Sequence, residues 1–423
     1  MRFRGWRRMS KRISKEVLPA VRFPEFRSKG AWLLFKLEDV AEFYKGKGLP
    51  KSAICDNGEL QCIHYGELFT AYSEVINSVK NRTNQESNFI SKPNDVLMPT
   101  SDITPNGLAK ASSLNIGGVV LGGDILIIRT NGSEVNGEFL SRFIRKEENQ
   151  VLKFVTGSTV YHLYGSSLGK LILSKPEFQE QQKIADCLSS IDELITAHTQ
   201  KLEALKAHKK GLMQQLFPAE GETVPKLRFP EFRGEWHKNT LKDICKINQG
   251  LQIPISKRFT EKVEGSYFYI TNEFLKAGAK NTYYIKNPTD SVICGKSDIL
   301  MTRTGNTGQV VTGVEGAFHN NFFKIKYIDN VVKEFLVFFL RSNRTQREIL
   351  TLAGASTIPD LNHNDFYKIE ISLPCQSEQQ KIADCLISVD EFIISQSQKI
   401  ESLKVHKKGL MQQLFPSIDG AGV

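Results

Sequence analysis

With 423 residues, the chain is long enough for two domains that each bury a hydrophobic core. Its 40% hydrophobic and 24% charged residues are typical of a soluble globular protein, and no apolar run approaches the roughly 18 residues of a membrane-spanning helix, which excludes a membrane-spanning chain. The net charge of +10 favours a polyanionic partner such as nucleic acid, because lysines and arginines that neutralise phosphates release condensed counterions, but charge alone does not identify that partner.

The N-terminus and the cysteines both favour a cytoplasmic location. Residues 1–12 are rich in Arg and Lys but lack the apolar core of a secretory signal, and Met9 is an alternative translation start, so we treat residues 1–17 as an N-terminal extension. The seven cysteines are odd in number and contain no C-x-x-C pair, which argues against a disulfide framework and a zinc site. We therefore expect no metal and no cofactor on this chain.

Residues 18–178 are predicted to form a first globular domain of mixed α and β structure. Residues 124–129 have the apolar pattern of a strand, and residues 138–154 have that of an amphipathic helix. The predicted loops carry side chains that can read base edges or hold phosphates. The candidates for DNA contact in this domain are Lys45, Lys47, Lys51, Arg82, Thr100, Ser101, Asp102, Thr104, Asn106 and Lys110.

Residues 179–218 are predicted to form one long helix, because apolar residues recur at spacings that alternate between four and three. Pro176 lies just upstream, and Gly211 and Pro218 lie near the other end, where helices tend to stop. The polar residues His198 and Lys209 occupy two positions of the apolar seam. The seam residues that we assign to a helical partner are Ile184, Leu188, Ile191, Ile195, Leu202 and Leu205.

Residues 219–376 are predicted to form a second mixed domain, with strands at 267–270, 298–301 and 322–327 and an amphipathic helix at 332–352. The loop around Arg303 and Asn306 is its strongest candidate for reading bases, because Gly305 permits close approach after a strand. The candidates for DNA contact in this domain are Asn248, Gln249, Gln252, Lys257, Arg258, Asn272, Arg303, Thr304, Asn306, Thr307, Gln309 and Asn320.

Residues 377–416 repeat the long helix, and residues 417–423 form a short tail. Residues 180–218 and 378–416 align without a gap at an offset of 198, and 29 of the 39 positions are identical. The motif RFPEFR also occurs twice, at 22–27 and 228–233, and each copy is followed by a tryptophan. The second seam consists of Ile382, Leu386, Val389, Ile393, Ile400 and Leu403, with Gln396 and Lys407 at its polar positions.

A sustained apolar repeat of 3.5 residues indicates helices that pack along a coiled-coil seam, and the other copy is the nearest partner for each. We therefore predict a mixed α/β fold in which two globular domains are separated by two long helices. The helices pair as an antiparallel coiled coil, with an approximate two-fold axis relating the halves. The alternative is that the two helices are unrelated surface helices of separate domains.

The repeated segment, which begins EQQKIADCLSSID and ends KKGLMQQLFP, resembles the conserved regions of the specificity subunits of type I restriction–modification enzymes. The LRFPEFRGEW run at 227–236 looks like the stretch that opens each target-recognition domain in that family. The resemblance implies that each variable domain binds one half of a bipartite, asymmetric sequence in double-stranded DNA. It also implies that the helices set the spacer between the halves.

The same resemblance implies partners and a division of labour. Two methyltransferase subunits would dock on the helices, and two restriction/translocase subunits would complete the complex. Methylation would target adenine with S-adenosylmethionine held by the methyltransferase, so this chain would have no catalytic residues. No motif of the family assigns individual base-reading residues, which leaves the loop candidates as predictions from side-chain chemistry.

Two other functions stay open. The alternatives are that the chain is a coiled-coil assembly scaffold that does not read DNA, or that it is itself an enzyme such as a nuclease or methyltransferase. It lacks a G-x-x-x-x-G-K-[ST] phosphate loop and an Asn- or Asp-Pro-Pro-aromatic motif. Asp360 with Glu370 imitates a metal-nuclease pattern, but Ser372 stands where that pattern needs a lysine. These absences favour a non-catalytic DNA-binding subunit.

Overall fold

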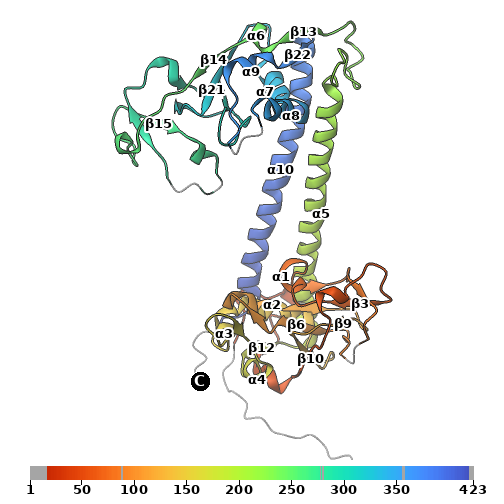
Figure 1. The fold of residues 1–423 in the computed structure, drawn as a ribbon. Coiled ribbons are helices and arrows are strands. Elements are labelled where there is room, and N and C mark those ends of the chain that lie inside the picture. The colour runs from red at the N-terminus through yellow and green to blue at the C-terminus, as the bar shows by residue number, and fades with distance from the viewer. Residues whose placement is uncertain (1–16, 87–88, 277, 279–280, 355–357, 419–423) are drawn as a thin grey trace, which may run out of the picture. The chain divides into compact units, whose positions relative to one another are not determined.

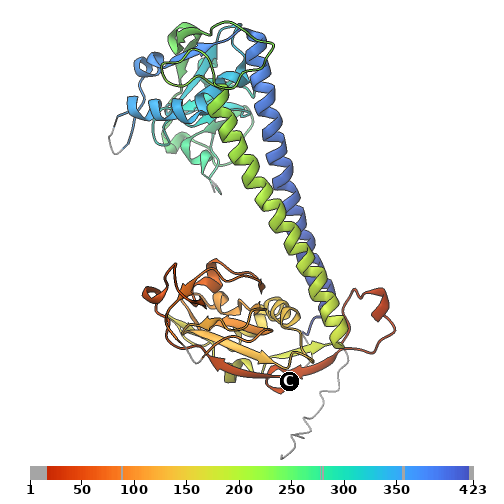
Figure 2. The same ribbon diagram turned by 90° about the vertical axis from the view of Figure 1, so that its right-hand side faces the viewer.

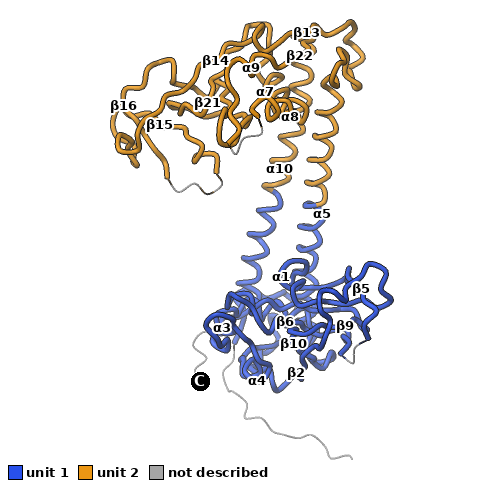
Figure 3. The backbone as a smooth tube through the Cα atoms, viewed as in Figure 1, with its two compact units in different colours: residues 1–199, 399–423 blue, residues 200–398 orange. Residues whose placement is uncertain are grey.

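The computed structural model describes residues 17–86, 89–276, 278, 281–354 and 358–418 (Figure 1). Tertiary contacts divide the chain into two compact units, which Figure 3 shows in blue and orange. Unit 1 comprises residues 1–199 and 399–423, and unit 2 comprises residues 200–398. The predicted N-terminal extension, residues 1–17, lies outside the described residues except for Val17.

Unit 1 is built on a five-stranded sheet in the order β2-β10-β6-β8-β4, on which helix α2 packs. All pairs in this sheet are antiparallel except β4 with β8. The strands are β1 (Leu33–Lys36), β2 (Ala41–Lys45), β3 (Leu60–Ile63), β4 (Val75–Ile76), β5 (Arg82–Thr83), β6 (Asp95–Pro99), β7 (Ser101–Asp102), β8 (Ser112–Leu114), β9 (Val120–Leu121), β10 (Ile125–Thr130), β11 (Tyr161–His162) and β12 (Ile172–Lys175). The short helices are α1 (Glu67–Thr70), α2 (Gly137–Lys146), α3 (Glu148–Leu152) and α4 (Gly165–Leu168).

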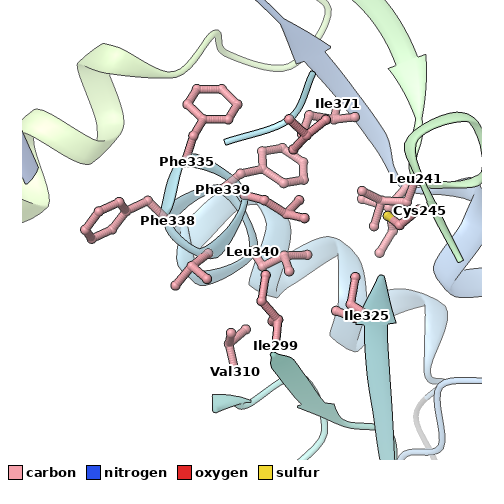
Figure 4. Close-up of a cluster of buried hydrophobic side chains, with 14 of the residues drawn as sticks. Leu241, Cys245, Ile299, Val310, Ile325, Phe335, Phe338, Phe339, Leu340 and Ile371 are labelled. Atoms are coloured by element: carbon pink, nitrogen blue, oxygen red, sulfur yellow. The ribbon is translucent and has the colours of Figure 1, made fainter. Parts of the chain in front are cut away.

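Unit 2 contains the sheets β14-β21-β18-β19 and β16-β15-β20-β17. The strands are β13 (His237–Thr240), β14 (Cys245–Gln249), β15 (Ser266–Ile270), β16 (Tyr284–Lys286), β17 (Ile293–Cys294), β18 (Ile299–Thr302), β19 (Val310–Val311), β20 (Gly316–Phe318), β21 (Phe322–Tyr327) and β22 (Glu370–Leu373). The short helices are α6 (Leu241–Ile244), α7 (Lys333–Arg341), α8 (Asn343–Leu352) and α9 (His363–Lys368). Figure 4 shows α7 directing Phe339 and Leu340 into the core of this unit, near Ile299 and Ile325.

The two units repeat one plan, as the duplicated sequence predicts. The order β2-β10-β6-β8 in unit 1 corresponds to β14-β21-β18-β19 in unit 2, and the pair β1-β12 corresponds to β13-β22. The predicted strands at 124–129, 298–301, 267–270 and 322–327 are present as β10, β18, β15 and β21. The mixed α/β prediction is therefore confirmed.

The predicted single helices at 138–154 and 332–352 were wrong, because each is two helices. Ser342 adopts an extended conformation between α7 and α8, and its side chain accepts the Thr345 N–H as an N-cap of α8. Glu147 interrupts the other segment between α2 and α3. A continuous amphipathic pattern persists across both breaks because each pair of helices covers the same core.

The two long helices are α5 (Phe178–Leu216) and α10 (Gln376–Leu414). Each begins two residues after a proline and ends two residues before another, as predicted, but Gly211 and Gly409 lie inside the helices and do not end them. In unit 1, Leu188 of α5 packs in the same cluster as Leu410 and Leu414 of α10. Within each unit the start of one helix therefore lies beside the end of the other, so the pair is antiparallel (Figures 1 and 2).

Each long helix starts with an identical set of contacts, which we call the N-terminal anchor. In unit 1, Arg22 donates two hydrogen bonds of 2.6 and 2.7 Å to Glu180, and Lys183 lies 5.7 Å above the ring of Phe23. Lys183 also pairs with Glu25 at 3.4 Å. In unit 2, the anchor consists of the equivalent contacts Arg228–Glu378, Lys381–Phe229 and Lys381–Glu231. The RFPEFR and EQQK motifs thus recur because they bind each other.

A glutamine next to each anchor fixes the domain helix to the long helix. Gln181 accepts the N–H of Asn136, the N-cap residue of α2, at 3.0 Å and donates to two backbone oxygens. Gln379 accepts the N–H of Val332, which precedes α7, at 2.8 Å. Both glutamines are buried, and a buried amide that satisfies its hydrogen bonds specifies one geometry. The start of each long helix is therefore held in one orientation on the globular domain of its unit.

Candidate nucleic-acid interface

The loop after β18 holds the strongest candidates of unit 2. Thr304 forms an isolated antiparallel bridge with Asp360, and the Arg303 N–H donates to the Asn321 carbonyl at 2.7 Å. The Arg303 guanidinium donates to both oxygens of Asp360 at 3.0 and 2.7 Å and lies 5.9 Å from the centre of the Phe323 ring. Arg303 is therefore held in place by its own unit, with part of its hydrogen-bonding capacity already used.

Gly305 brings this loop against Asn272. Its φ of +86° lies in the left-handed region, and a Cβ there would stand 2.2 Å from Asn272 Nδ2, so only glycine fits. Asn272 donates to the Thr304 carbonyl at 2.9 Å, and its other amide atom, Oδ1, is buried without a hydrogen-bond partner among the described residues. Thr307 donates to the Pro359 carbonyl at 2.6 Å, and Gln309 pairs through its backbone with Thr302.

A second polar group in unit 2 forms around Asn320. Gln249 donates to the Asn320 carbonyl at 3.3 Å, and Asn320 donates to Gln252 at 3.4 Å. Burial and the nearby Arg258 lower the pKa of His319 below its usual value, so its neutral ring accepts the Asn321 N–H at Nδ1. The backbone bond between Arg303 and Asn321 joins this group to the β18 loop. The structure therefore brings Gln249, Gln252, Asn320 and the loop candidates onto one surface region.

The remaining candidates of unit 2 differ in their exposure. Arg258 lies between the rings of Tyr269 and Tyr283 and donates twice to the Ile253 carbonyl, which indicates a structural role. Lys257 ends the short 3₁₀ helix Ile255–Lys257 and is exposed. Asn248 lies within β14, paired with Lys324. Of these, Lys257 is the side chain open to a phosphate.

In unit 1 the equivalent loop follows β6 and is held in the same way. Strand β7 pairs with β11, so that Asp102 lies opposite Tyr161 and Ser101 opposite His162. Thr100 is buried and donates to Asp124 at 3.2 Å, while Thr104 donates to Asp102 at 2.8 Å. In both units, therefore, the residues that follow strand β6 or β18 pair with a segment that comes after the domain helices in the sequence.

The other loop candidates of unit 1 fall into two groups. Asn106 donates to Glu148 at 2.8 Å, and Lys110 donates to the Phe69 carbonyl at 3.3 Å, so both stabilise the loop after β6. Lys45 pairs with Asp124 at 3.0 Å, which also binds Thr100 and places Lys45 beside this loop.

Three candidates of unit 1 are not brought to that loop by any hydrogen bond or ion pair within the described residues. Arg82 donates to the carbonyls of Gly58 and Glu59 and stabilises a separate turn. Lys47 lies 5.4 Å from the ring centre of Phe89, and Lys51 opens a short 3₁₀ helix. Both lysines are exposed, as phosphate contacts require.

The predicted loops also contain exposed apolar side chains that the sequence analysis missed. Ile103 is 76% exposed between Asp102 and Thr104, and Ile255 is 71% exposed two residues before Lys257. An apolar side chain can contact the methyl group of thymine in the major groove. For Ile103, the sequence signal was a lone isoleucine among polar loop residues.

Four of the predicted seam residues, Ile184, Leu188, Ile382 and Leu386, belong to the hydrophobic clusters of the two units. The buried members are Ile184, Leu188, Ile191, Ile382, Leu386, Val389 and Ile400, and the half-buried members are Ile195, Leu202, Leu205, Ile393 and Leu403. The polar seam residue Lys209 binds Asp390 at 2.6 Å, and Lys407 binds Asp192 at 2.6 Å. The two lysines thus form the same cross-helix ion pair, once in each unit.

The described part of the chain contains neither a candidate metal site nor a candidate membrane span. No group of three or more His, Cys, Asp or Glu side chains there is arranged to hold a metal ion. No described helix is long and apolar enough to cross a membrane. All seven cysteines are free thiols.

The chain matches one protein family twice. The family is described as "Type I restriction modification DNA specificity domain", and the matches cover residues 29–207 and 233–405. The MjaVIII type I restriction enzyme specificity subunit of Methanocaldococcus jannaschii is 24% identical over 408 residues, which cover 91% of this chain and 92% of the relative. The putative MjaX specificity subunit of the same organism is 26% identical over 304 residues, 70% of this chain and 71% of the relative.

Solved structures share the fold. The S subunit of a type I restriction–modification system from M. genitalium superposes with a TM-score of 0.58 at 16% identity, covering 95% of this chain and 99% of that chain. A chain from a study of complex assembly and conformational transition in a type I system also gives a TM-score of 0.58 at 16% identity, with coverage of 91% and 97%.

Proposed function

Because the chain belongs to the type I restriction–modification DNA specificity family, we propose that each of its two units binds one half of a bipartite, asymmetric DNA sequence. As a specificity subunit, the chain supplies the DNA specificity of a larger complex. The target-recognition domains in this proposal are residues 18–178 and 219–376. The long helices at 179–218 and 377–416 set the spacer between the half-sites.

One observation carries the proposal: the family match occurs twice, and each match includes one globular domain whose loops differ from those of the other. The anchors and the sheet order repeat, but the residues of the loops after β6 and β18 do not. Equivalent scaffolds with different reading loops favour two different half-sites. Base-edge hydrogen bonds from Asn306 and Thr304 in unit 2, and from Ser101 and Thr104 in unit 1, would supply the discrimination.

The chemistry belongs to partner subunits in this proposal. Two methyltransferase subunits bind this chain and hold S-adenosylmethionine, and two restriction/translocase subunits complete the nuclease. The chain itself contributes binding and geometry only. Lys47, Lys51 and Lys257 would hold phosphates, which fixes the register of the protein on DNA without reading sequence.

Mapping N6-methyladenine across a host genome tests this function. The chain is expressed with its cognate methyltransferase subunit, and the control strain expresses the methyltransferase alone. We expect a split, asymmetric methylated motif that appears only with the chain. Exchanging residues 18–178 for the same domain of another specificity subunit should change one half of that motif and leave the other half intact. A motif independent of the chain would favour the scaffold alternative, and a change in both halves would contradict two separate recognition domains.

A further inference from the structure

We propose that Arg303 of unit 2 reads a guanine in the DNA half-site of that unit, and that Asp360 is the positioning residue that turns the guanidinium toward the base. The inference rests on the proposed function and deepens it, because it assigns one base of the target to one side chain. Asp360, which in the sequence imitates part of a metal-nuclease pattern, thereby receives a role in recognition.

The guanidinium of Arg303 has one edge in use and one edge free. An arginine carries five N–H donors in a rigid, planar fork. Asp360 accepts the Nε–H at 3.0 Å and one Nη2–H at 2.7 Å. Among the described residues, Nη1 and the second hydrogen of Nη2 have no acceptor, and the side chain is 19% exposed. The end of the fork therefore keeps two parallel donors for a ligand.

Two parallel donors match one base edge in the major groove. Guanine presents two neighbouring acceptors there, N7 and O6. Adenine presents N7 beside an amino donor, cytosine presents an amino donor, and thymine presents one acceptor beside a methyl group. A second donor of the arginine would meet a donor or a methyl group on each of these three bases. The free edge of Arg303 therefore selects guanine.

Asp360 also makes the pair better suited to a base than to a phosphate. Its carboxylate neutralises Arg303 and is itself 49% exposed, so it lies at the surface beside the free edge of the guanidinium. A phosphate at this edge would be repelled by the carboxylate, because like charges placed side by side raise the free energy of a complex. The edge of a base is uncharged and meets no such repulsion.

The backbone and the core hold this pair in place before any DNA binds. The Arg303 N–H donates to the Asn321 carbonyl at 2.7 Å, and the Arg303 carbonyl accepts the Leu361 N–H at 2.9 Å. The guanidinium lies 5.9 Å from the centre of the Phe323 ring, and both Phe323 and Leu361 are fully buried. A side chain that is already ordered loses little conformational entropy on binding, which favours a specific contact.

Unit 1 carries different side chains at the equivalent positions. Thr100 directly follows β6 as Arg303 directly follows β18, and His162 lies 198 residues before Asp360. The backbone pairing is shared, since His162 lies opposite Ser101. Thr100 is buried, and a hydroxyl cannot supply the two parallel donors of a guanidinium. One backbone position thus carries the guanine-reading pair in unit 2 only, as two different half-sites require.

The test uses the full chain with its cognate methyltransferase subunit and duplexes that carry the methylated motif. The domain exchange described above identifies the half that unit 2 reads. Each guanine of that half is replaced in turn by 7-deazaguanine, which lacks the N7 acceptor, or by inosine, which keeps both major-groove acceptors. At one position, we expect 7-deazaguanine to weaken wild-type binding about tenfold and inosine to have little effect. Arg303→Ala should bind the guanine and 7-deazaguanine duplexes equally.

Methylome sequencing of the variants separates recognition from folding. Arg303→Ala should accept any base at that position and leave the half-site of unit 1 unchanged. Asp360→Asn should weaken the preference for guanine at the same position without weakening binding to unrelated DNA, because it removes a negative charge from the surface. Arg233→Ala removes the same charge at an exposed position of unit 2 outside the loop, and it should keep the guanine.

Three results would overturn the inference and leave the proposed function standing. The first is a unit 2 half-site without guanine on either strand. The second is an equal effect of 7-deazaguanine on wild type and on Arg303→Ala. The third is weaker binding of Asp360→Asn to all DNA, which would show that the pair only stabilises the loop. The absence of any methylated motif that depends on the chain would instead overturn the proposed function.

Discussion

Glu378 is 1% exposed and accepts two hydrogen bonds from Arg228, so removing the arginine leaves a carboxylate in the protein interior. Breaking a buried ion pair from one side costs about 3–5 kcal/mol, because the remaining charge has lost its compensation. By contrast, Glu231 and its partner Lys381 are each about half exposed, and such surface pairs contribute about 0–1 kcal/mol. Two contacts of the same anchor therefore differ several-fold in their contribution to stability.

We predict that Arg228→Met destabilises unit 2 by about 3–5 kcal/mol and that Glu231→Gln, the matched control, changes stability by at most about 1 kcal/mol. Hydrogen exchange of residues 219–240 and of the first turns of α10 measures the effect locally. The double variant Arg228→Met with Glu378→Gln should recover part of the loss, since it removes the buried charge. Equal protection in the two single variants would contradict the anchor.

Two candidates of unit 2, Asn306 and Lys257, allow specific and non-specific DNA contacts to be separated. We expect Asn306→Ala to weaken binding of the assembled complex to its own sequence by about 1–3 kcal/mol, with little effect on unrelated DNA. Lys257→Ala should weaken binding to all sequences and reduce the salt slope by about one. Fluorescence titrations with cognate and scrambled duplexes at several salt concentrations measure both. A uniform loss for Asn306→Ala would show that this residue does not read a base.

Arg303 illustrates what a sequence reveals about a single residue. The strand, the glycine and the arginine predict a loop that approaches a ligand; the structure confirms the strand and places Gly305 against Asn272. The sequence could not reveal that Asp360, 57 residues later, binds both ends of the guanidinium. Long-range pairing of this kind depends on tertiary geometry. The base-reading role of the loop therefore stays a prediction.

The same aspartate position is used differently in the two copies of the long helix. Among the described residues, Asp390 forms an ion pair with Lys209 only, whereas Asp192 binds Lys407 and also Arg142, which is fully buried in α2. In α7 the equivalent of Arg142 is Phe338, and Lys209 lies 5.2 Å from the centre of its ring. An aromatic ring needs no counter-ion, but a buried guanidinium does. The cost of losing the aspartate should therefore differ between the units.

We predict that Asp192→Asn destabilises the helix pair of unit 1 by about 3–5 kcal/mol, because Arg142 remains charged and buried. The equivalent Asp390→Asn in unit 2 should cost about 1 kcal/mol or less, because Lys209 and Asp390 are both partly exposed. Hydrogen exchange in residues 184–198 and 384–396 compares the two units within one experiment. A similar loss of protection in both would refute the role assigned to Arg142.

The elements of the fold differ in how far the sequence predicted them. Both long helices were predicted almost to the residue, because prolines bound them and a seam of eight apolar positions runs along each. The break between α7 and α8 was missed, since Ser342 caps a helix with a side chain that also occurs inside helices. The short strands β7 and β11, which hold the loop of unit 1, have two residues each. Two residues are too few to show a periodic pattern.

At the scale of the molecule, each long helix belongs to both units. Residues 178–199 of α5 lie in unit 1 and residues 200–216 in unit 2, whereas α10 starts in unit 2 and ends in unit 1. Every unit therefore receives one anchored helix start and one helix end. At the ends, Phe415 packs 5.1 Å from Phe139 in unit 1, and Phe217 packs 5.1 Å from Phe335 in unit 2. The repeated sequence segments therefore correspond to these two attachments, the anchored helix start and the packed helix end.

Under the proposed function, the length of the DNA spacer depends on the length of the two long helices. Inserting one heptad after Thr199 and another after Gln398 lengthens both helices by about 10 Å, which equals about three base pairs. The seam is preserved because seven residues turn a helix to within about 20° of its starting face. Three base pairs turn B-DNA by roughly 100°, however. We therefore predict a methylated motif whose spacer is about three base pairs longer, with reduced methylation and unchanged half-sites.

Methylome sequencing of cells that carry the double insertion measures spacer and half-sites together. Insertion into α5 alone is the control, and it should abolish methylation, because one longer helix cannot keep the cross-helix pairs Lys209–Asp390 and Lys407–Asp192 in register. Replacing seven exposed helix residues without changing the length should leave the motif intact. An unchanged spacer in the double insertion, at wild-type levels of methylation, would show that something other than the helix pair determines the separation of the half-sites.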